Sequence, residues 1–482
     1  MSLKLRNGSR VGVVGGGPAG SLFAYFLLSF ASQSGVKLDV DIYEPRDFTR
    51  PGPAGCNMCA GIVSESLFQV LAAEGIPLPS GLVQRTIDSY VLRTDGGGVK
   101  IDAPWNGKTT AAVQRGGGPL GSCEVSRGGL DNHLLVQAQR VGARAIEARI
   151  RDAGWEDGRP QVRLPDRSES YDLLVAATGV NSSGWQLLDQ LGLPGRRPET
   201  TRAYIAEVKW GRDAISQRFG NSLHILLLDI PRLQFAALIP KGEFLTVVLL
   251  GREITPDLIR GFFANPVVAD CLPRGWTPSD AACHCSPRIN VREAERPFLD
   301  RVVLVGDSGV TRLYKDGLGA AYRTAMAAAS TAVLHGVSAN DFRMHYWPTY
   351  RSIAIDNRFG WLIFALVQRI KRSKSMREGV LRMAAREQSQ GAVGGRVSTA
   401  LWEMFTGGAP YRRILLQALH PHLLGRYLWE STAVAGSSLH GQVTSQFLRR
   451  QSEEEVSRGT ALISFPDGTN HCSGETYVGG NS

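Results

Sequence analysis

A glycine-rich turn near the N-terminus has the residue types and spacing that hold a phosphate group. Gly15, Gly17 and Gly20 form a G-x-G-x-x-G pattern that follows the apolar residues 11–14 and precedes the apolar residues 21–31. In such a unit the first glycine allows the tight bend, the second lets a pyrophosphate approach the backbone, and the third lets the helix pack against the strand. Because amide groups at the start of a helix attract negative charge, the pattern predicts a dinucleotide site.

An acidic residue follows at the position where such a site needs one. Glu44 comes directly after the predicted strand 38–43, 24 residues beyond Gly20, and can accept hydrogen bonds from the ribose hydroxyls of an adenosine. Glycines alone at this spacing are a weak signal, whereas glycines with a strand, a helix and a placed acid are specific. NAD and FAD sites share this turn, so the rest of the chain must distinguish them.

Two further segments carry that distinction. The apolar residues 302–305 are followed by Gly306 and Asp307, and an alanine-rich stretch begins ten residues after Asp307, at Gly317. Residues 124–135 read Glu-Val-Ser-Arg-Gly-Gly-Leu-Asp-Asn-His-Leu-Leu. With these segments and the glycine turn, the first 340 residues resemble the flavoprotein superfamily that contains p-hydroxybenzoate hydroxylase, the flavin-dependent halogenases and the geranylgeranyl reductases.

The resemblance implies that the dinucleotide is FAD. In that superfamily the aspartate of the Gly-Asp pair binds the ribityl chain. The helix start that follows faces the pyrimidine end of the flavin, where a positive helix end stabilises the anionic reduced form. Arg127 corresponds to an arginine that contacts the phosphate region; the alternative is a solvated arginine at a helix start. The cofactor-binding residues predicted in this way are Gly15, Gly17, Pro18, Ala19, Gly20, Glu44, Arg127, Gly306, Asp307, Gly317, Leu318 and Gly319.

Within the superfamily the chain is most similar to the geranylgeranyl reductases. The loop 55–61 lies where those enzymes carry a Cys-Gly-Gly loop, and residues 235–240 lie where they carry an aromatic strand beside the substrate. Ala237 replaces the tryptophan of that strand, the halogenase Trp-x-Trp-x-Ile-Pro signature is absent, and Thr178-Gly179 stands where hydroxylases have Asp-Gly. These features favour FAD-dependent reduction or dehydrogenation of an apolar, isoprenoid-like substrate. The alternatives are an NAD(P)H-dependent flavin monooxygenase and a non-catalytic electron-transfer flavoprotein.

No motif identifies a catalytic residue, and the candidates are Cys56, Tyr314 and Lys315. Tyr314 and Lys315 fall near the expected flavin edge, where they could donate protons. The pairs Cys56/Cys59 and Cys283/Cys285 could supply four thiolates to zinc or an iron–sulfur cluster, or Cys56 and Cys59 could exchange electrons with the flavin. The third alternative is that all four are structural, and we expect no metal.

The order of these segments predicts an α/β fold: a Rossmann-like FAD-binding domain with an inserted β-sheet substrate domain and a helical C-terminal region. We expect the FAD-binding domain to combine three stretches of the chain and the substrate domain two. The predicted boundaries are 1–75, 125–195 and 284–340 for the FAD-binding domain, 76–124 and 196–283 for the substrate domain, 341–450 for the helical region, and 451–482 for a polar, disordered tail.

The composition of the chain limits the kinds of binding partner that we expect. The net charge of +10 suits an anionic cofactor, but the sequence has no zinc-finger, basic-zipper or RNA-binding signature, so we expect no nucleic acid. Residues 358–377 hold six basic side chains and no acid, which predicts a docked helix with a solvated basic face or, alternatively, contact with an anionic membrane or a redox protein. The odd count of seven cysteines favours a reducing compartment. The glycine turn explains the basic, then apolar N-terminus better than a signal peptide does, and we expect a cytoplasmic protein that binds a small apolar or lipid-like substrate.

Overall fold

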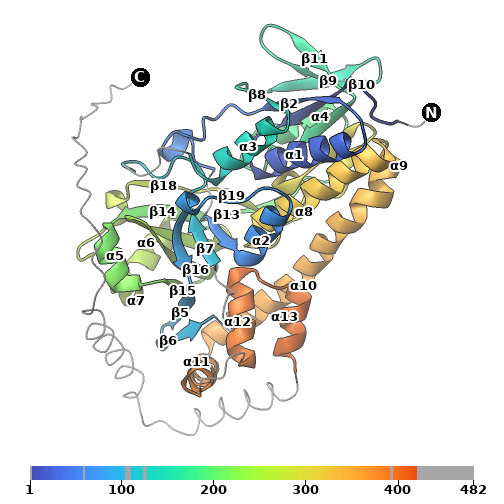
Figure 1. Cartoon of the computed structure of the whole chain (residues 1–482). Helices are drawn as coiled ribbons and strands as arrows, with labels where there is room; N and C mark the ends of the chain where they lie inside the picture. Colours follow the sequence, from blue (N-terminus) through green and yellow to red (C-terminus); the bar gives the residue numbers. More distant parts are fainter. Residues whose placement is uncertain (1–2, 58–59, 104–109, 123–127, 391–394, 421–482) are drawn as a thin grey trace, which may run out of the picture.

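The computed structural model describes residues 3–57, 60–103, 110–122, 128–390 and 395–420, and a mostly parallel six-stranded sheet forms its upper half (Figure 1). The strands follow the order β20-β21-β12-β1-β2-β8, and only β20 is antiparallel to its neighbour. They are β1 (Ser9–Val14), β2 (Leu38–Tyr43), β8 (Arg144–Ile146), β12 (Leu173–Ala176), β20 (Phe298–Leu299) and β21 (Val302–Leu304). Strands from three distant stretches of the chain therefore form one sheet.

Helices cover one face of this sheet, and a small meander covers the other. Helix α1 (Pro18–Gln33) packs against α8 (Gly317–Ser330), whose alanines allow a close approach, and α3 (Leu130–Arg140) lies beside α1. α1 begins at Pro18, three residues before the apolar run 21–31, because proline suits the first helical turn, where its missing N–H is not needed. The opposite face packs on β9 (Asp152–Glu156), β10 (Arg159–Arg163), β11 (Ser168–Ser170) and α4 (Gly184–Gln190).

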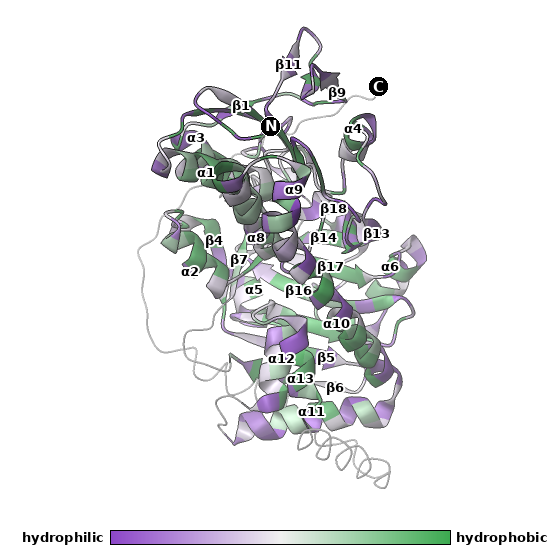
Figure 2. Cartoon of the chain, turned by 90° about the vertical axis from the view of Figure 1, so that its right-hand side faces the viewer, coloured by the Kyte–Doolittle hydropathy of each residue, from purple (hydrophilic) through white to green (hydrophobic). Residues whose placement is uncertain are grey.

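A second, seven-stranded sheet forms the lower half. Its order is β18-β14-β17-β16-β15-β5-β6, antiparallel except between β15 and β5. Figure 2 shows its central strands as hydrophobic, in keeping with their burial on both faces. The strands are β5 (Ser89–Thr94), β6 (Gly97–Asp102), β14 (Tyr204–Lys209), β15 (Ser222–Leu227), β16 (Leu233–Lys241), β17 (Phe244–Gly251) and β18 (Cys283–Cys285).

Helices also enclose this second sheet. One face packs on α5 (Arg212–Phe219) and α6 (Pro256–Phe263). The other face packs on the C-terminal helices, with the rings of Phe235 and Phe364 stacked at 6.0 Å. These helices are α10 (Trp347–Arg372), α11 (Lys374–Ser389), α12 (Arg396–Thr406) and α13 (Tyr411–Ala418).

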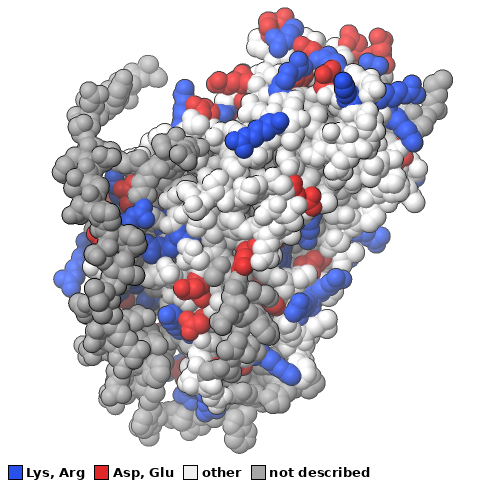
Figure 3. All heavy atoms as spheres, in the orientation of Figure 1, with Lys and Arg blue, Asp and Glu red and all other residues white. Residues whose placement is uncertain are grey.

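The predicted fold class is confirmed, but the domain boundaries stay predictions. A small sheet joins β3 (Ile62–Ser64) to β7 (Thr110–Val113) and β4 (Val83–Ile87), so its strands come from both sides of the boundary drawn at residue 75. No helix among the described residues is both long and apolar enough to cross a bilayer. On the face seen in Figure 3, lysines and arginines alternate with carboxylates, and no continuous basic patch forms. The tail 451–482 lies outside the described residues.

The single helix predicted over 358–377 divides at Ser373 between α10 and α11; α10 is docked, but one of its basic side chains points inward. Lys371 is buried against β16, where its ammonium donates to the carbonyl oxygens of Leu233 (2.6 Å) and Gln234 (3.3 Å). Burial lowers the pKa of Lys371 to about 8. The helix thus uses Lys371 to satisfy carbonyl groups at the start of β16, a central strand of the sheet.

This burial predicts a pH-dependent stability. A lysine whose pKa falls from about 10.5 in the unfolded chain to about 8 in the folded one binds fewer protons when folded between those values. The free energy of unfolding should therefore rise as the pH increases from about 8 to about 10.5. Urea unfolding at pH 7.5 and pH 10 measures this rise, and Lys371→Met should reduce it. An equal rise in the variant would contradict the assignment.

Candidate cofactor and substrate site

A cavity of about 400 Å³ lies where the carboxyl ends of β1, β2 and β12 meet the second sheet. One part is lined by the glycine turn and polar side chains, and the other by apolar side chains of the seven-stranded sheet. Of the predicted cofactor residues, the cavity is lined by Gly15, Gly17, Pro18, Ala19, Glu44, Asp307, Gly317 and Leu318. The structure therefore brings together residues that are up to 303 positions apart in the chain.

The glycine turn has the geometry that its sequence predicts. Gly15 has a φ of +106°, and a Cβ atom there would lie 2.4 Å from the carbonyl oxygen of Ala177. Gly20 does not line the cavity; a Cβ atom there would lie 1.9 Å from the oxygen of Gly15, so it permits the close packing of helix on turn. No side chain caps α1 at Gly17, and its first turn holds no acid. Its amide groups at the cavity are suited to a pyrophosphate.

Glu44 lies at the end of β2 and braces the turn. Its two carboxylate oxygens accept the backbone N–H groups of Gly16 (2.9 Å) and Arg46 (3.1 Å). Burial raises the pKa of Glu44, and the hydrogen bonds from the backbone N–H groups of Gly16 and Arg46 oppose this shift. Since each carboxylate oxygen can accept more than one hydrogen bond, Glu44 keeps capacity for ribose hydroxyls.

A polar network beside the turn was not predicted from the sequence. The Nε and Nη2 atoms of Arg115 donate to the two oxygens of Asp131, at 2.5 Å and 3.1 Å, and Asp131 is fully buried. Asn57 links Asp131 to Arg46, donating to the first and accepting from the second, both at 2.8 Å. Arg46, Asn57 and Arg115 line the cavity, so two arginines can face an anion there. In the sequence, the run of three glycines that follows Arg115 was the feature that could have pointed to this network. The predicted Arg127 lies outside the described residues.

Asp307 lies just beyond the carboxyl end of β21 and lines the cavity. Burial raises the pKa of its carboxyl group, while a hydrogen bond with Thr311 and the nearby Arg115 oppose the rise. Gly306 has a φ of +62°, and a Cβ atom there would lie 2.6 Å from the Cβ of Ala19, so this glycine lets β21 meet the start of α1. A carboxylate enclosed in this way is suited to sugar-type hydroxyls.

The start of α8 differs from the expected open helix end. Asp316, with a φ of +55°, caps the helix by accepting the N–H of Gly319 at 3.2 Å. Arg312 and Arg323 lie 3.7 and 3.8 Å from this carboxylate. Gly319 does not line the cavity. The helix end that the resemblance places against the flavin is therefore partly neutralised by a residue of its own chain.

The three candidate catalytic residues lie in different places. Tyr314 and Lys315 line the cavity, and the ammonium of Lys315 lies 5.0 Å above the ring of Tyr411. Burial lowers the pKa of Lys315 well below its usual range. Cys56 does not line the cavity. Burial raises the pKa of the Cys283 thiol, and the nearby Glu207 and Cys56 add to this rise. Among the described residues no three His, Cys, Asp or Glu side chains form a metal site; Cys59 lies outside them.

The other part of the cavity is an apolar chamber. Its wall is the inner face of the seven-stranded sheet, and Ala237 takes the position where the resemblance places a tryptophan. Phe405 closes it from α12. Its apolar lining residues are Ala203, Ile205, Leu223, Ile225, Phe235, Ala237, Ile239, Val248, Leu250, Ile289 and Phe405.

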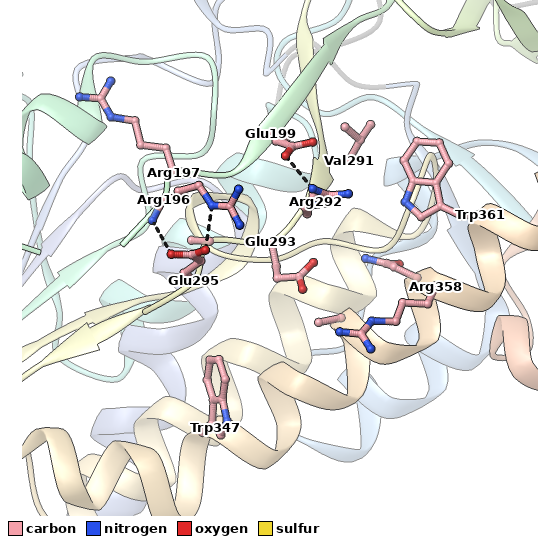
Figure 4. Close-up of a pocket in the computed structure, with 13 residues that line it drawn as sticks. Arg196, Arg197, Glu199, Val291, Arg292, Glu293, Glu295, Trp347, Arg358 and Trp361 are labelled. Carbon is pink, nitrogen blue, oxygen red and sulfur yellow. Dashed lines mark hydrogen bonds and ion pairs between the residues drawn. The ribbon is translucent and has the colours of Figure 1, made fainter. Parts of the chain in front are cut away.

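A second cavity, of about 420 Å³, lies between α10 and β19 (Arg288–Arg292), as Figure 4 shows. Three of its four arginines already pair with carboxylates: Arg196 with Glu295, Arg292 with Glu199, and Arg197 with Asp189. The two cavities share a wall, since Trp361 lines the second and its ring packs edge-on against Tyr314 of the first, at 6.1 Å. Of these two cavities in the described part of the chain, the first combines backbone suited to a phosphate with an apolar chamber.

Comparisons with known proteins agree with this architecture. No family model matches the sequence, and no curated protein does either. Among solved structures, the chain is similar to a tetrameric 2-methyl-3-hydroxypyridine-5-carboxylic acid oxygenase, with a TM-score of 0.54 and 18% identity over 79% of this chain and 96% of that one. A p-nitrophenol 4-monooxygenase from Pseudomonas putida gives 0.52 and 16% over 88% and 99%.

A third match extends beyond oxygenases. A flavoprotein/dehydrogenase from Cytophaga hutchinsonii gives a TM-score of 0.54 and 14% identity over 83% of this chain and 94% of that one. At these identities the likeness shows the fold. The chain therefore has the fold shared by these oxygenases and this flavoprotein.

Proposed function

We propose that the chain is an FAD-dependent oxidoreductase that acts on a small apolar substrate. One observation carries this proposal: a single cavity joins the uncapped start of α1, Glu44 and Asp307 to an apolar chamber. The first part suits a dinucleotide, and the second suits a molecule with few polar groups. The fold of the flavoprotein and the oxygenases supports the same assignment.

The residues present fit FAD. The backbone of Gly17 and Ala19, with Arg46 and Arg115 nearby, would hold the pyrophosphate, Glu44 the adenosine ribose, and Asp307 the ribityl chain. Bound FAD would supply hydride and electron transfer, which no side chain of the cavity provides. The protein would contribute orientation of the substrate and exclusion of water by the apolar wall.

For the reaction we favour reduction or dehydrogenation of an apolar, isoprenoid-like substrate. Thr178-Gly179 stands where hydroxylases carry Asp-Gly. In this chain the Ser308 hydroxyl accepts the N–H of Gly179 at 2.9 Å and so helps to hold the backbone at this position. Ala237 leaves the chamber wall without the tryptophan of the geranylgeranyl reductases, so the substrate need not match theirs.

NAD(P)H-dependent monooxygenation is the second candidate. The solved structures with this fold include an oxygenase and a monooxygenase that act on ring compounds by their names. An apolar chamber lined by Phe235 and Phe405 would also accept an aromatic ring.

One experiment tests the cofactor and separates the two reactions. Purified protein should be yellow and release FAD, rather than FMN or NAD, on denaturation. After reduction with NAD(P)H or dithionite, it is offered isoprenoid and aromatic compounds under labelled oxygen, and products are analysed by mass spectrometry. We expect reduced products without label, and hydrogen peroxide in air. Label in a product would select monooxygenation, and a protein that cannot be loaded with FAD would overturn both candidates.

A further inference from the structure

One side of α10 points away from the protein and is partly apolar. The helix lies at the right-hand edge of the molecule in Figure 1 and at the front in Figure 2, which is turned by 90°. Its residues Ile355, Leu362 and Leu366 are 39%, 59% and 39% exposed. Their spacing along the helix places them on one side of it. The outward side of a helix that packs on a protein core is usually polar, so this side of α10 departs from the common pattern.

Arginines lie along the same side of the helix. Arg351, Arg358 and Arg369 are exposed, and in a helix with about 3.6 residues per turn they fall with the three apolar residues within about 80° of the circumference. No ion pair or hydrogen bond joins these three side chains to any other described residue. Other exposed arginines of the chain, such as Arg163, do pair with a carboxylate. We call these six residues the apolar–basic stripe.

No carboxylate of α10 lies in the apolar–basic stripe. The one acidic residue of the helix, Asp356, points to another side, where its two oxygens accept the backbone N–H groups of Tyr411 (2.9 Å) and Arg412 (3.0 Å). Glu293 lines the second cavity together with Arg358, but no ion pair joins the two side chains. The stripe therefore presents apolar surface together with positive charge that the described part of the chain does not neutralise.

We propose that the apolar–basic stripe docks on the surface of a membrane that contains anionic lipids. The apolar side chains would enter the boundary between headgroups and acyl chains, while the longer arginine side chains reach the lipid phosphates beside them. Anionic headgroups complement the charge of the three arginines. The stripe is a convex ridge about 27 Å long from Arg351 to Arg369, and a fluid lipid surface can receive it without a matching groove. This inference is independent of the proposed function, because the stripe does not line the first cavity.

Vesicle binding of the full chain tests this proposal. The protein is sedimented with vesicles of phosphatidylcholine alone and of phosphatidylcholine mixed with phosphatidylserine, at low and at high salt. We expect binding to the mixed vesicles only, and weaker binding at high salt, because ions screen the arginines. Leu362→Asp should lower the partition coefficient at least fivefold or so, because it removes apolar contact and adds a charge of the same sign as the lipid. Arg351→Gln with Arg369→Gln should lower it roughly 25-fold, since each basic residue near such a surface strengthens binding about fivefold.

Matched controls make the same changes elsewhere on the surface. Leu120→Asp alters a leucine that is 46% exposed and lies outside α10. Arg163→Gln with Arg167→Gln removes the same net charge from the β10–β11 hairpin, where the two side chains are 56% and 48% exposed. Both controls should bind the mixed vesicles as the wild type does, and circular dichroism should show every variant folded.

Three outcomes would overturn the proposal. The first is a wild type that does not bind the mixed vesicles. The second is a loss of binding in the control variants that equals the loss in the stripe variants, or stripe variants that bind as the wild type does. The third is a wild type that self-associates in analytical ultracentrifugation, does not bind vesicles and becomes monomeric in Leu362→Asp, which would assign the stripe to a second copy of the chain.

Discussion

Asp307→Ala is expected to lose most of its FAD while keeping its fold. The carboxylate is enclosed at the carboxyl end of β21 and would accept hydroxyl groups of the ribityl chain. A hydrogen bond to a charged group contributes about 1.5–3 kcal/mol, so the dissociation constant for FAD should rise roughly 10- to 150-fold. Fluorescence titration of apoprotein with FAD measures this change directly.

The fold itself should tolerate this substitution. Burial already disfavours the charged form of Asp307, so its removal should not lower the free energy of unfolding of the apoprotein much. Asp307→Asn is the matched variant, since it keeps the shape and one acceptor oxygen and should lose less affinity. Unchanged FAD affinity in Asp307→Ala, with circular dichroism like that of the wild type, would remove Asp307 from the cofactor site.

Asp131→Ala is expected to destabilise the protein strongly. Asp131 is fully buried, and its removal would leave the guanidinium of Arg115 without its carboxylate and Asn57 without an acceptor. Breaking a buried ion pair from one side costs about 3–5 kcal/mol. Denaturant unfolding of the apoprotein measures the loss, and FAD affinity should fall as well, because Arg46 and Arg115 would lose their fixed positions.

An exposed pair on the same half of the molecule is the control. Asp152 and Arg163 lie 2.8 Å apart, with 41% and 56% of their side chains exposed. Asp152→Ala should cost less than about 1 kcal/mol, because water screens exposed ion pairs. Similar losses in the two variants would mean that the Asp131 network is no more than a surface pair.

The parts of the site that the sequence predicted are those where the backbone itself carries the constraint. Gly15 and Gly20 are glycines because a Cβ atom at either position would collide with main-chain oxygens, and such constraints leave a readable pattern. Strands such as β1 and β21 are apolar because both their faces are buried. Local rules of this kind need no knowledge of the rest of the chain.

The parts that could not be predicted depend on contacts between distant residues. Nothing in the order of residues shows that Arg115 meets Asp131, or that Asp316 caps α8 and weakens its positive end. The Tyr314 hydroxyl is buried without a hydrogen-bond partner among the described residues, and this burial arises only when α10 packs beside it. Pairings of this sort follow from tertiary packing, which a single sequence does not specify residue by residue.

The assembly of one sheet from three stretches of chain has a consequence for biosynthesis. Strand β12 has β1 on one side, but its other edge waits for β21, which leaves the ribosome about 126 residues after the end of β12. At about 5–20 residues per second, this delay lasts roughly 6–25 s. During that interval the apolar edge of β12, which is buried in the folded protein, can pair with strands other than β21. Chaperones protect chains in this state. The loop before α8 is completed later still, once Asn357 and Tyr411 have emerged to hold the backbone of Leu313.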